Sequence, residues 1–362
     1  MGWPLPNTAT STSTAQTLAL VTITSALVIS LALQKSAKAM PTIAIEMPNL
    51  PPQIHAGGFQ NSRSQSLFTI HLPRKVMSTP AKSMLIFVHG LADHCCRAGY
   101  IEMYQKLASA GVDVYSFDSH GHGRSEGEPR GYVEKFDHYV SDLLEYIQHC
   151  QQKYAEKGET SPPLLLLGHS MGALISVLAV LRLGSENVGG LLLTGPALGV
   201  DMNPVLHIQK MFAPAIDKFL PKSKIVDAVR PKDMSRNPEA VQAYIDDPLI
   251  PKGKLIARTA IQVDRAFDVA KERRGAITCP ILMLHGTNDR CTSIKASRDF
   301  FRHVGSSKKR FLQLPGLFHE IFEEPEVGQF MPSIVGFVSS GGNEFVDIGG
   351  KDDDGLIDVV FK

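Results

Sequence analysis

The segment that most constrains the fold of this chain lies between residues 164 and 173. Four leucines form a short apolar run typical of a buried strand, and the sequence Gly-His-Ser-Met-Gly follows at once, before a helical pattern. This is the G-x-S-x-G arrangement of a nucleophile elbow, in which a sharp strand-to-helix turn raises a serine hydroxyl above a sheet. Gly168 and Gly172 suit such a turn because its flanks are too crowded for larger side chains. We therefore predict that Ser170 is a nucleophile.

Apolar runs bounded by turn residues alternate with amphipathic stretches from about residue 57 onward. This alternation predicts a mostly parallel sheet wrapped by helices. The predicted strands cover residues 66–71, 84–88, 112–118, 164–167, 191–194, 281–285 and 311–314. The predicted helices cover residues 100–110, 132–154, a stretch that opens at Ser170, and 294–303.

A long insertion separates the strand that ends at residue 194 from the one that starts at residue 281. Roughly eighty residues lie between them, whereas a crossover helix needs only about 10 to 20. We interpret residues 199–276 as an inserted cap. One apolar face recurs in it at helical spacing, formed by Val205, Ile208, Phe212, Ile216 and Phe219. This face is either buried on the cap's own core or forms a lipid-facing rim around the substrate entrance.

A serine hydroxyl needs a neighbouring base to remove its proton, and a carboxylate must hold that base in one tautomer. Asp289 follows the predicted strand 281–285, and His319 follows the predicted strand 311–314. Both therefore lie past the carboxyl end of a strand, where such sheets assemble their sites, and in the order serine, acid, histidine. We predict that Ser170, Asp289 and His319 form a catalytic triad. His169 and Glu320 are sequence neighbours of triad members, so we expect their side chains to point elsewhere.

An oxyanion hole needs two backbone N–H groups. Met171 follows the nucleophile and provides the first. We assign the second to Leu91, in the loop after the predicted strand 84–88. Gly90 would let this backbone approach the substrate, and His89 would fix the loop through its ring.

Charge and cysteine content restrict the partners. The 37 basic and 36 acidic residues nearly balance at a formal charge of +1, so nothing indicates a nucleic-acid partner. The cysteines are odd in number and lack the paired spacing of a structural zinc site: Cys95, Cys96, Cys150, Cys279 and Cys291. We interpret them as free thiols in a reducing compartment, and we expect neither a metal nor a cofactor.

The amino-terminal 40 residues form a separate segment. Residues 1–34 carry no charged side chain, and residues 18–33 are largely apolar. A helix over that run would span roughly 24 Å, slightly short of a hydrocarbon core of about 30 Å. We interpret residues 1–40 as a membrane anchor, and Lys35 and Lys38 behind it favour a cytosolic catalytic domain. A cleaved signal leading to the secretory pathway stays open because Ala37-Lys38-Ala39 resembles a cleavage site, as does a disordered or transit-type leader.

The predicted organisation follows from these segments. It comprises the leader 1–40, a proline-rich linker 41–56, the first part of the core 57–198, the cap 199–276, the second part of the core 277–338 and a flexible tail 339–362.

Several motifs together resemble the monoacylglycerol lipase and lysophospholipase-like family of α/β-hydrolases. The similarity covers roughly residues 66–338, and its motifs are His89-Gly90, Asp118-Ser-His-Gly-His-Gly-Arg-Ser-Glu-Gly127, Gly168-His-Ser-Met-Gly172, Ser235-Arg-Asn-Pro238 with Asp246-Asp-Pro-Leu249, and Gly286-Thr-Asn-Asp289. The resemblance implies an α/β-hydrolase fold, with a mostly parallel central sheet flanked by helices and an inserted helical cap. It also implies an esterase without a cofactor, whose cap forms a hydrophobic tunnel for one acyl chain.

We therefore expect a serine hydrolase that converts monoacylglycerols to fatty acid and glycerol through an acyl-enzyme, at a membrane surface. A lysophospholipase or another single-chain carboxylesterase remains open. From a different class, a catalytically silent receptor or scaffold on the same fold also remains open, since fold alone does not determine function. The sequence does not indicate an oligomeric state.

Overall fold

The computed structural model describes residues 50–201, 204–226, 230–353 and 355–361. The leader predicted at residues 1–40 lies outside these ranges. Within them, no helix combines the length and the apolar character that crossing a membrane requires.

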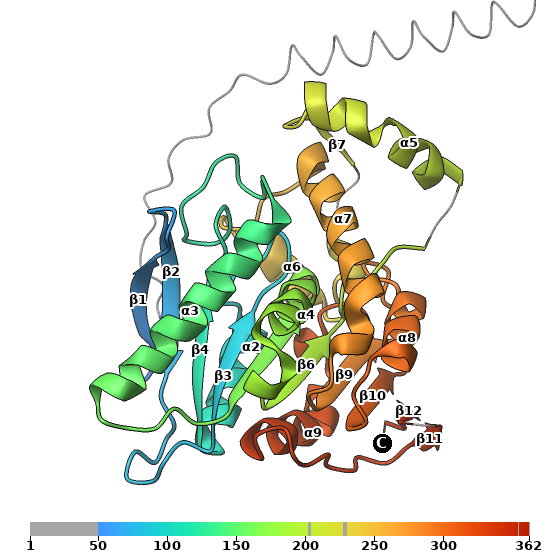
Figure 1. Cartoon of the computed structure of the whole chain (residues 1–362). Coiled ribbons are helices and arrows are strands. Elements are labelled where there is room, and N and C mark those ends of the chain that lie inside the picture. Colours follow the sequence, from blue (N-terminus) through green and yellow to red (C-terminus); the bar gives the residue numbers. More distant parts are fainter. Residues whose placement is uncertain (1–49, 202–203, 227–229, 354, 362) are drawn as a thin grey trace, which may run out of the picture. The chain divides into compact units, whose positions relative to one another are not determined.

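A ten-stranded sheet forms the centre of the described chain, in the order β1-β2-β4-β3-β5-β6-β9-β10-β12-β11 (Figure 1). The strands from β4 to β12 in this order run parallel, and antiparallel strands complete both edges. The strands are β1 (His55–Gln60), β2 (Ser66–Leu72), β3 (Ser83–Val88), β4 (Val112–Phe117), β5 (Leu164–His169), β6 (Gly190–Thr194), β9 (Ile281–Gly286), β10 (Lys309–Leu314), β11 (Lys351–Asp353) and β12 (Leu356–Asp358). Parallel strands covered on both faces are nearly continuous apolar runs. The predicted mostly parallel sheet is confirmed.

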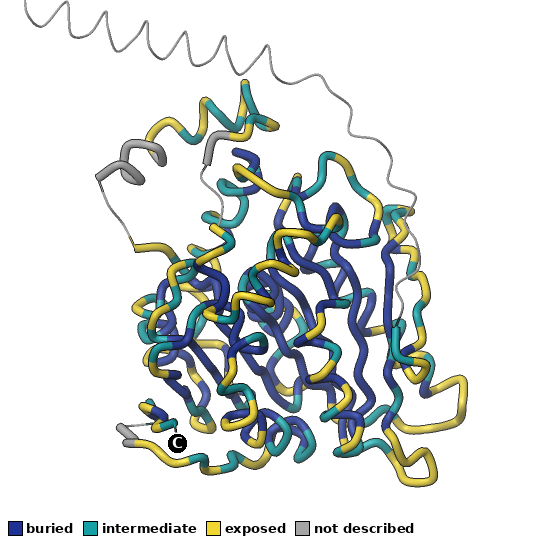
Figure 2. Tube along the Cα trace, turned by 180° about the vertical axis from the view of Figure 1, so that it is seen from behind, coloured by how far each residue is buried: buried dark blue, intermediate teal, exposed yellow. Residues whose placement is uncertain are grey.

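Helices cover both faces of this sheet. On one face lie α3 (Phe136–Glu156), α4 (Met171–Leu183), α7 (Ala257–Arg273) and α8 (Ile294–His303), and on the other lie α2 (Ala98–Ser109) and α9 (Val327–Ser339). Short 3₁₀ helices are η1 (Ser185–Asn187), η2 (Pro231–Asp233), η3 (Arg274–Ala276) and η4 (Ile321–Glu323). A separate cluster of buried apolar side chains fills each interface, and the strands between them are buried (Figure 2).

The cap consists of α5 (Pro204–Phe219), the small sheet of β7 (Lys224–Val226) and β8 (Leu255–Ile256), α6 (Pro238–Asp246) and the first part of α7. Further along, α7 joins the core, because Ala266 and Ala270 are buried in the same cluster as α4. The side chains of Phe212 and Phe219 on α5 are 55% and 71% exposed. The interpretation that their face is buried on the cap's own core is therefore wrong for these two residues. The side chains of Val205 and Ile208 lie outside the described part.

Contacts with the cap explain why one helix begins later than predicted. A helix was expected over residues 132–154, but α3 begins only at Phe136. The preceding loop instead binds α7, since the N–H of Val133 donates to the hydroxyl of Thr259 (3.0 Å) and the N–H of Phe136 donates to Gln262 Oε1 (3.1 Å). Tertiary hydrogen bonds here replace the first helical turn.

Both ends of the catalytic domain extend further than predicted. The linker expected at residues 41–56 ends early, because Ile54 is buried and β1 begins at His55. Two glycines and a largely exposed pattern conceal this strand in the sequence. The flexible tail expected at residues 339–362 is wrong, since β12 pairs in parallel with β10 and buries Ile357 and Val359.

Two adjacent valines test whether the carboxyl-terminal strand contributes to stability. Val359 is 3% exposed and Val360 is 69% exposed. Each buried CH₂ contributes about 0.8 kcal/mol and a cavity adds to the loss, so Val359→Ala should lower the free energy of unfolding by about 2 kcal/mol. The matched control Val360→Ala should change it by less than about 0.5 kcal/mol. Chemical denaturation measures the free energy of unfolding of both variants. Negligible effects of both substitutions would support the earlier prediction of a flexible tail.

Candidate active site

The site lies at the carboxyl edge of the parallel strands. Strand register pairs Val88 with Gly168, and His169 with Thr194. The loop after β3, the elbow after β5 and the loop after β6 therefore leave the sheet at the same level. The loops after β9 and β10 follow along the same edge.

Ser170 occupies the turn between β5 and α4 with φ 53° and ψ −119°. A positive φ is unusual for a residue with a Cβ atom and is a mark of functional strain. The two flanking glycines have no space for a side chain. A Cβ atom at Gly168 would lie 2.5 Å from Ala173 Cα, and one at Gly172 would lie 2.0 Å from the Val88 carbonyl oxygen. The turn is thus as crowded as the sequence motif predicted.

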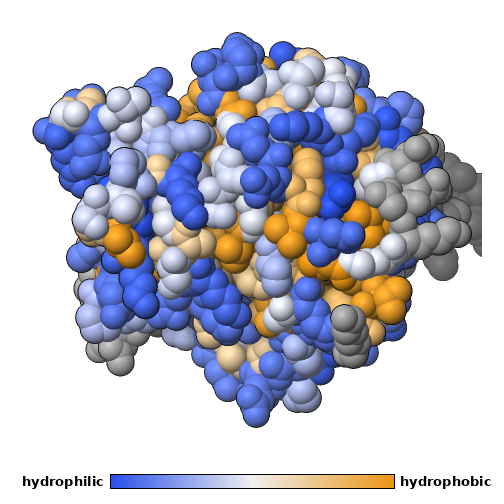
Figure 3. Space-filling view, turned by 90° about the horizontal axis from the view of Figure 1, so that it is seen from below, coloured by the Kyte–Doolittle hydropathy of each residue, from blue (hydrophilic) through white to orange (hydrophobic). Residues whose placement is uncertain are grey.

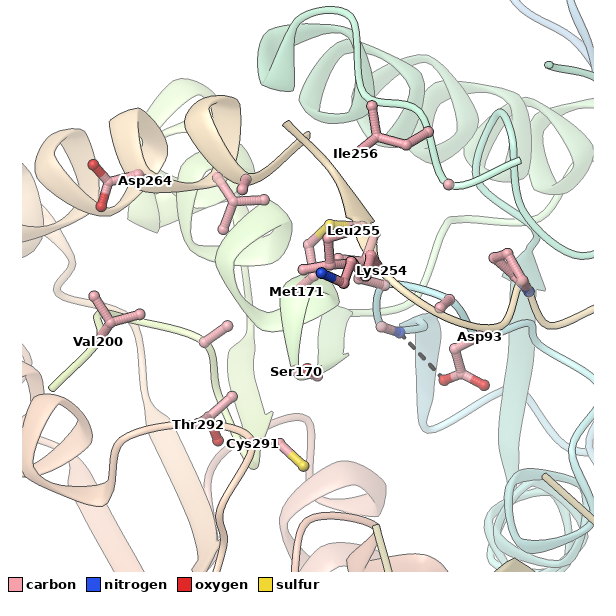
Figure 4. A pocket seen from close by; sticks show the side chains of 18 of the residues that line it. Asp93, Ser170, Met171, Val200, Lys254, Leu255, Ile256, Asp264, Cys291 and Thr292 are labelled. Atoms are coloured by element: carbon pink, nitrogen blue, oxygen red, sulfur yellow. Dashed lines mark hydrogen bonds between the residues drawn. The ribbon is translucent and has the colours of Figure 1, made fainter. Parts of the chain in front are cut away.

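The loop after β3 packs directly on the nucleophile. A Cβ atom at Gly90 would lie 3.0 Å from Ser170 Cβ, so the backbone approaches closely here. The ring of His89 braces this loop, because Nδ1 donates to the Gly90 carbonyl (2.7 Å) and Nε2 accepts the N–H of Ser119 (2.9 Å). The Gly90 N–H donates to Asp93 Oδ2 at 3.3 Å (Figure 4).

The two predicted oxyanion residues, Leu91 and Met171, line the same cavity as Ser170. Met171 opens α4, where first-turn N–H groups have no acceptor within the helix. The positive end of the helix dipole also lies at this point. Both features suit a site where negative charge develops on an oxygen.

Asp289 and His319, 30 residues apart in the chain, meet above the sheet. His319 Nδ1 donates to Asp289 Oδ2 at 2.7 Å, and both groups are buried. His319 also lies over the end of β6, where a Cβ atom at Gly195 would come within 3.1 Å of Nδ1. Gly195 has φ 47°, so backbone conformation and space both favour glycine. Nothing in the linear sequence near Gly195 indicated this role.

Asp289 is held in one orientation by four further donors. Oδ1 accepts the N–H groups of Cys291 (2.7 Å) and Thr292 (3.0 Å). Oδ2 accepts the Thr292 hydroxyl (2.8 Å) and faces His285 Nε2 (3.1 Å). Burial raises the pKa of this carboxyl, but the charge of His319 and the histidine hydrogen bonds outweigh burial and hold the pKa well below its usual range. Asp289 is therefore ionised.

The same hydrogen-bonded pair also shifts the pKa of His319. Burial lowers the pKa of His319, whereas the adjacent Asp289 carboxylate raises it, and the net direction is upward. With Nδ1 committed to Asp289, Nε2 is the nitrogen left to accept a proton from the serine. Sequence reasoning missed His285 and Thr292 as supports for the acid. Their only signal was their position, at the end of β9 and three residues after Asp289.

The two sequence neighbours of the predicted triad, His169 and Glu320, have hydrogen-bond and charge partners of their own, but they do not point away from the site as expected: the His169 ring centroid lies 4.8 Å from that of His319, and Glu320 offers a carboxylate oxygen within 4.8 Å of the same ring. His169 Nδ1 lies 3.1 Å from the Thr194 hydroxyl, and Nε2 faces Glu320 Oε1 at 3.4 Å. Glu320 is buried and also contacts Arg97 Nη1 (3.1 Å) and the Tyr100 hydroxyl (3.2 Å). Burial raises the pKa of Glu320, but the charge of Arg97 and the interactions with His169 and His319 together outweigh burial and lower the pKa strongly. A compensated charge cluster thus lies next to His319.

A cavity of about 660 Å³ extends from Ser170 and His319 into the cap. Figure 4 shows Leu255 and Ile256 of the cap above Ser170, and Cys291 and Thr292 of the core below it. The cavity walls are mainly apolar and include Leu91, Met171, Val200, Ile216, Ile256 and Phe267. This is the size range of small-molecule sites. The arrangement provides one polar end for chemistry and one apolar space for a hydrocarbon.

Two groups of three side chains bring metal-binding atoms within 4.8 Å of one another: His169, His319 and Glu320, and Asp289, Cys291 and His319. Both depend on His319, whose Nδ1 already donates to Asp289. We assign these atoms to the hydrogen-bonded pair and to the charge cluster.

A doubly wound sheet with a serine on the elbow and a buried His–Asp pair defines the class: this is a serine hydrolase of the α/β-hydrolase fold. Residues 79–326 match the family model of the S33 serine aminopeptidases. The chain is 31% identical over 268 residues to the monoacylglycerol lipase of Mycolicibacterium smegmatis, covering 72% of this chain and 90% of that protein. It is also 31% identical to the monoglyceride lipase of Rattus norvegicus, covering 74% and 84%.

The crystal structure of the Paleococcus ferrophilus monoacylglycerol lipase matches with a TM-score of 0.63 and 29% identity, over 76% of this chain and 99% of that one. The chain therefore belongs to the monoacylglycerol-lipase-like family of α/β-hydrolase serine hydrolases. The resemblance and the fold class predicted from the sequence are confirmed.

Proposed function

We propose that this chain hydrolyses the ester bond of monoacylglycerols to fatty acid and glycerol. Ser170 Oγ attacks the ester carbonyl while His319 Nε2 takes its proton, and the N–H groups of Leu91 and Met171 bind the oxyanion. His319 then passes the proton to the departing glycerol oxygen, which leaves an acyl-serine. Water, activated by the same histidine, releases the fatty acid and restores Ser170.

The observation that carries this proposal is the cavity that joins the catalytic end to an apolar space under the cap. A long acyl chain gains roughly 0.8 kcal/mol for each buried CH₂, so an apolar channel selects it without charged contacts. A neutral glycerol head needs no charged cluster. The relatives described above are named as monoacylglycerol or monoglyceride lipases, which supports the same substrate.

Peptide hydrolysis, suggested by the name of the matching family model, is less well supported. An aminopeptidase needs an uncompensated acid to bind the substrate ammonium group. Three acids line the cavity. Asp264, on cap helix α7, has an interaction partner within the protein. The other two are Asp93 and Glu320, and the buried guanidinium of Arg97 lies 3.7 Å from Asp93 and 3.1 Å from Glu320. Their charge is already compensated within the protein.

A lysophospholipid remains the second candidate because the cavity lining also includes the cations Arg130, Lys224, Lys252, Lys254 and Arg265. Lys254 and three of the others already have partners. Arg130 donates to the Ser125 carbonyl, Lys252 donates to the Tyr244 and Asp247 carbonyls, and Arg265 pairs with Asp217. The neutral head group is thus the better fit.

A substrate panel tests the proposal. The purified enzyme should hydrolyse long-chain monoacylglycerol much faster than triacylglycerol, because the cavity accommodates one chain. Fatty-acid release from matched monoacyl, triacyl and lysophospholipid substrates in detergent micelles measures this. Equal rates on monoacylglycerol and triacylglycerol would reject the single-chain cavity, and faster lysophospholipid hydrolysis would favour the second candidate.

We also propose that the cap docks on a lipid surface. Ala213, Pro214 and Ile216 of α5 line the cavity, whereas Met211, Phe212 and Phe219 are exposed on the same helix. An amphipathic helix that combines exposed apolar residues with lysines is typical of interfacial binding. Here Lys218 lies in the last turn of α5, and Lys222 follows just after the helix. Figure 3 shows the molecule from below, opposite the cap at the top of Figure 1, and that face is predominantly hydrophilic with smaller hydrophobic patches. The anchor predicted at residues 1–40 would add a second attachment, on the cytosolic side.

Vesicle flotation separates the two attachments. A chain lacking residues 1–40 should still bind phosphatidylcholine and phosphatidylserine vesicles, and Phe212→Ser with Phe219→Ser should reduce that binding about tenfold, since each exposed Phe inserts apolar area. Met77→Ser, an exposed methionine outside the cap, is the matched control. Unchanged binding of the double variant would exclude the α5 surface.

Carbonate extraction of the full-length chain tests the leader, because extraction into the soluble fraction would exclude an integral anchor.

A further inference from the structure

Two adjacent cysteines lie in the loop between β3 and α2. The Sγ atoms of Cys95 and Cys96 are 3.7 Å apart, Cys95 is fully buried and Cys96 is partly exposed. A disulfide requires about 2.05 Å, so the two sulfurs lie within roughly 2 Å of bonding distance. All five cysteines are free thiols, as predicted. Neither member of this pair lines the cavity or takes part in the chemistry proposed above.

Cys96 is the one thiol of the five whose pKa lies below its ordinary value. The hydrogen bond with Cys95 lowers the pKa of Cys96 to about 7, so much of it is thiolate near neutral pH. In the other four cysteines, burial is the largest effect on the pKa. It raises the pKa of Cys95, raises that of Cys150 to about 12 and of Cys279 to about 11, and also raises that of Cys291. The thiolate is the form that attacks peroxides, and Cys95 lies next to it as the second thiol.

The pair is connected to both the cap and the catalytic end. The Cys96 N–H donates to His94 Nδ1 (3.1 Å), and His94 Nε2 donates to Asp247 Oδ2 (2.7 Å), directly after cap helix α6. On the other side, Arg97 contacts Glu320, the residue after His319. Displacement of Cys96 would therefore disturb both the attachment of the cap and the charge cluster next to His319.

Cys95 itself is held in place. Its N–H donates to Asp118 Oδ1 (2.8 Å), and its carbonyl accepts the Tyr104 hydroxyl (3.1 Å). Closure of an S–S bond would therefore move mainly Cys96 and its neighbours His94 and Arg97. The same loop carries the N–H of Leu91.

We propose that Cys95 and Cys96 form a redox-active dithiol that a hydroperoxide oxidises to a disulfide, and that the oxidised enzyme loses ester hydrolysis. The Cys96 thiolate attacks the peroxide, the O–O bond breaks, and a sulfenic acid forms while hydroxide leaves and takes a proton. The Cys95 thiol then attacks Cys96 Sγ, the S–S bond forms and the sulfenic oxygen leaves as water. The two sulfurs lose two electrons in total, and hydrogen peroxide is reduced to two molecules of water.

The test uses the full-length chain in detergent micelles, treated with hydrogen peroxide and then blocked with N-ethylmaleimide. Tryptic cleavage after Lys82 and Arg97 yields a peptide whose only cysteines are this pair. We expect this peptide to lose two hydrogen atoms and to gain no maleimide. Hydrolysis of p-nitrophenyl butyrate should fall about 100-fold, in line with misplacement of a catalytic loop by about 1 Å, and dithiothreitol should restore it. This short ester reports on activity whatever the natural lipid is.

Cys96→Ser should keep near-normal basal activity and resist peroxide, and the matched control Cys150→Ser should respond like the wild type. Phenylarsine oxide, which binds two neighbouring thiols, should bind the wild type in one equivalent. Two outcomes would overturn the proposal: a sulfinic acid at Cys96 beside an alkylated Cys95, or equal peroxide sensitivity in Cys96→Ser. If the serine variant does not fold, lack of arsenical binding to the wild type would overturn it instead.

Discussion

Ser170→Ala is expected to abolish covalent labelling by a fluorophosphonate probe and to lower the rate of ester hydrolysis by about 10⁴-fold or more. The hydroxyl of Ser170 is the only group of this residue that takes part in the proposed chemistry. The residue's strained φ of 53° is imposed by the elbow, not by the hydroxyl, so the fold should be retained. Probe labelling, steady-state kinetics and circular dichroism measure the three effects.

The matched control for this variant is Ser176→Ala. Ser176 is a buried serine of α4, the helix that follows Ser170, and its hydroxyl donates to the Gly172 carbonyl (2.9 Å). Its replacement should leave probe labelling intact. If Ser170→Ala were still labelled at the wild-type rate, another residue would be the nucleophile.

Asp289→Asn is expected to lower the turnover number by about 10⁴-fold without unfolding the chain. The N–H groups of Cys291 and Thr292 both point at Oδ1, so the carbonyl oxygen of an asparagine must take that position. Its NH₂ group then faces His319 Nδ1, which has to accept a hydrogen bond instead of donating one. The proton of His319 moves to Nε2, and the nitrogen that should receive the serine proton is blocked. Loss of the carboxylate also removes the charge that raises the pKa of His319.

Kinetics of the variant at several pH values measure this effect, with Asp299→Asn as control. Asp299 is a partly exposed acid on α8 that pairs with Arg274 and His303, and its replacement should leave turnover near the wild-type value. Near-normal turnover in Asp289→Asn would show that a different carboxylate orients the base. Glu320 would then be the first to test, because one of its carboxylate oxygens lies within 4.8 Å of a ring nitrogen of His319.

The sequence could locate the strands that carry the site because of how a parallel sheet is built. Strands such as β5 and β9 are buried on both faces, so they are unbroken apolar runs. Glycines mark the elbow because no Cβ atom fits there, as the 2.0 Å approach to Gly172 shows. Several other elements lack such signals. β1 is largely exposed and contains two glycines, α9 contains Pro332, and β12 has three residues, so their formation depends on the neighbours they pack against.

Local pattern by itself therefore determined the elbow, the order of serine, acid and histidine, and the presence of a long insertion, since each of these is written in contiguous residues. Only the tertiary structure decided which distant groups meet. In the folded chain, His285 and Thr292 contact the Asp289 carboxylate. His319 packs against Gly195, and Glu320 pairs with Arg97. The physical reason is that hydrogen bonds, charge compensation and close approach act over a few ångströms in space. Those distances are set by the order and register of the strands, which no single segment of the sequence encodes.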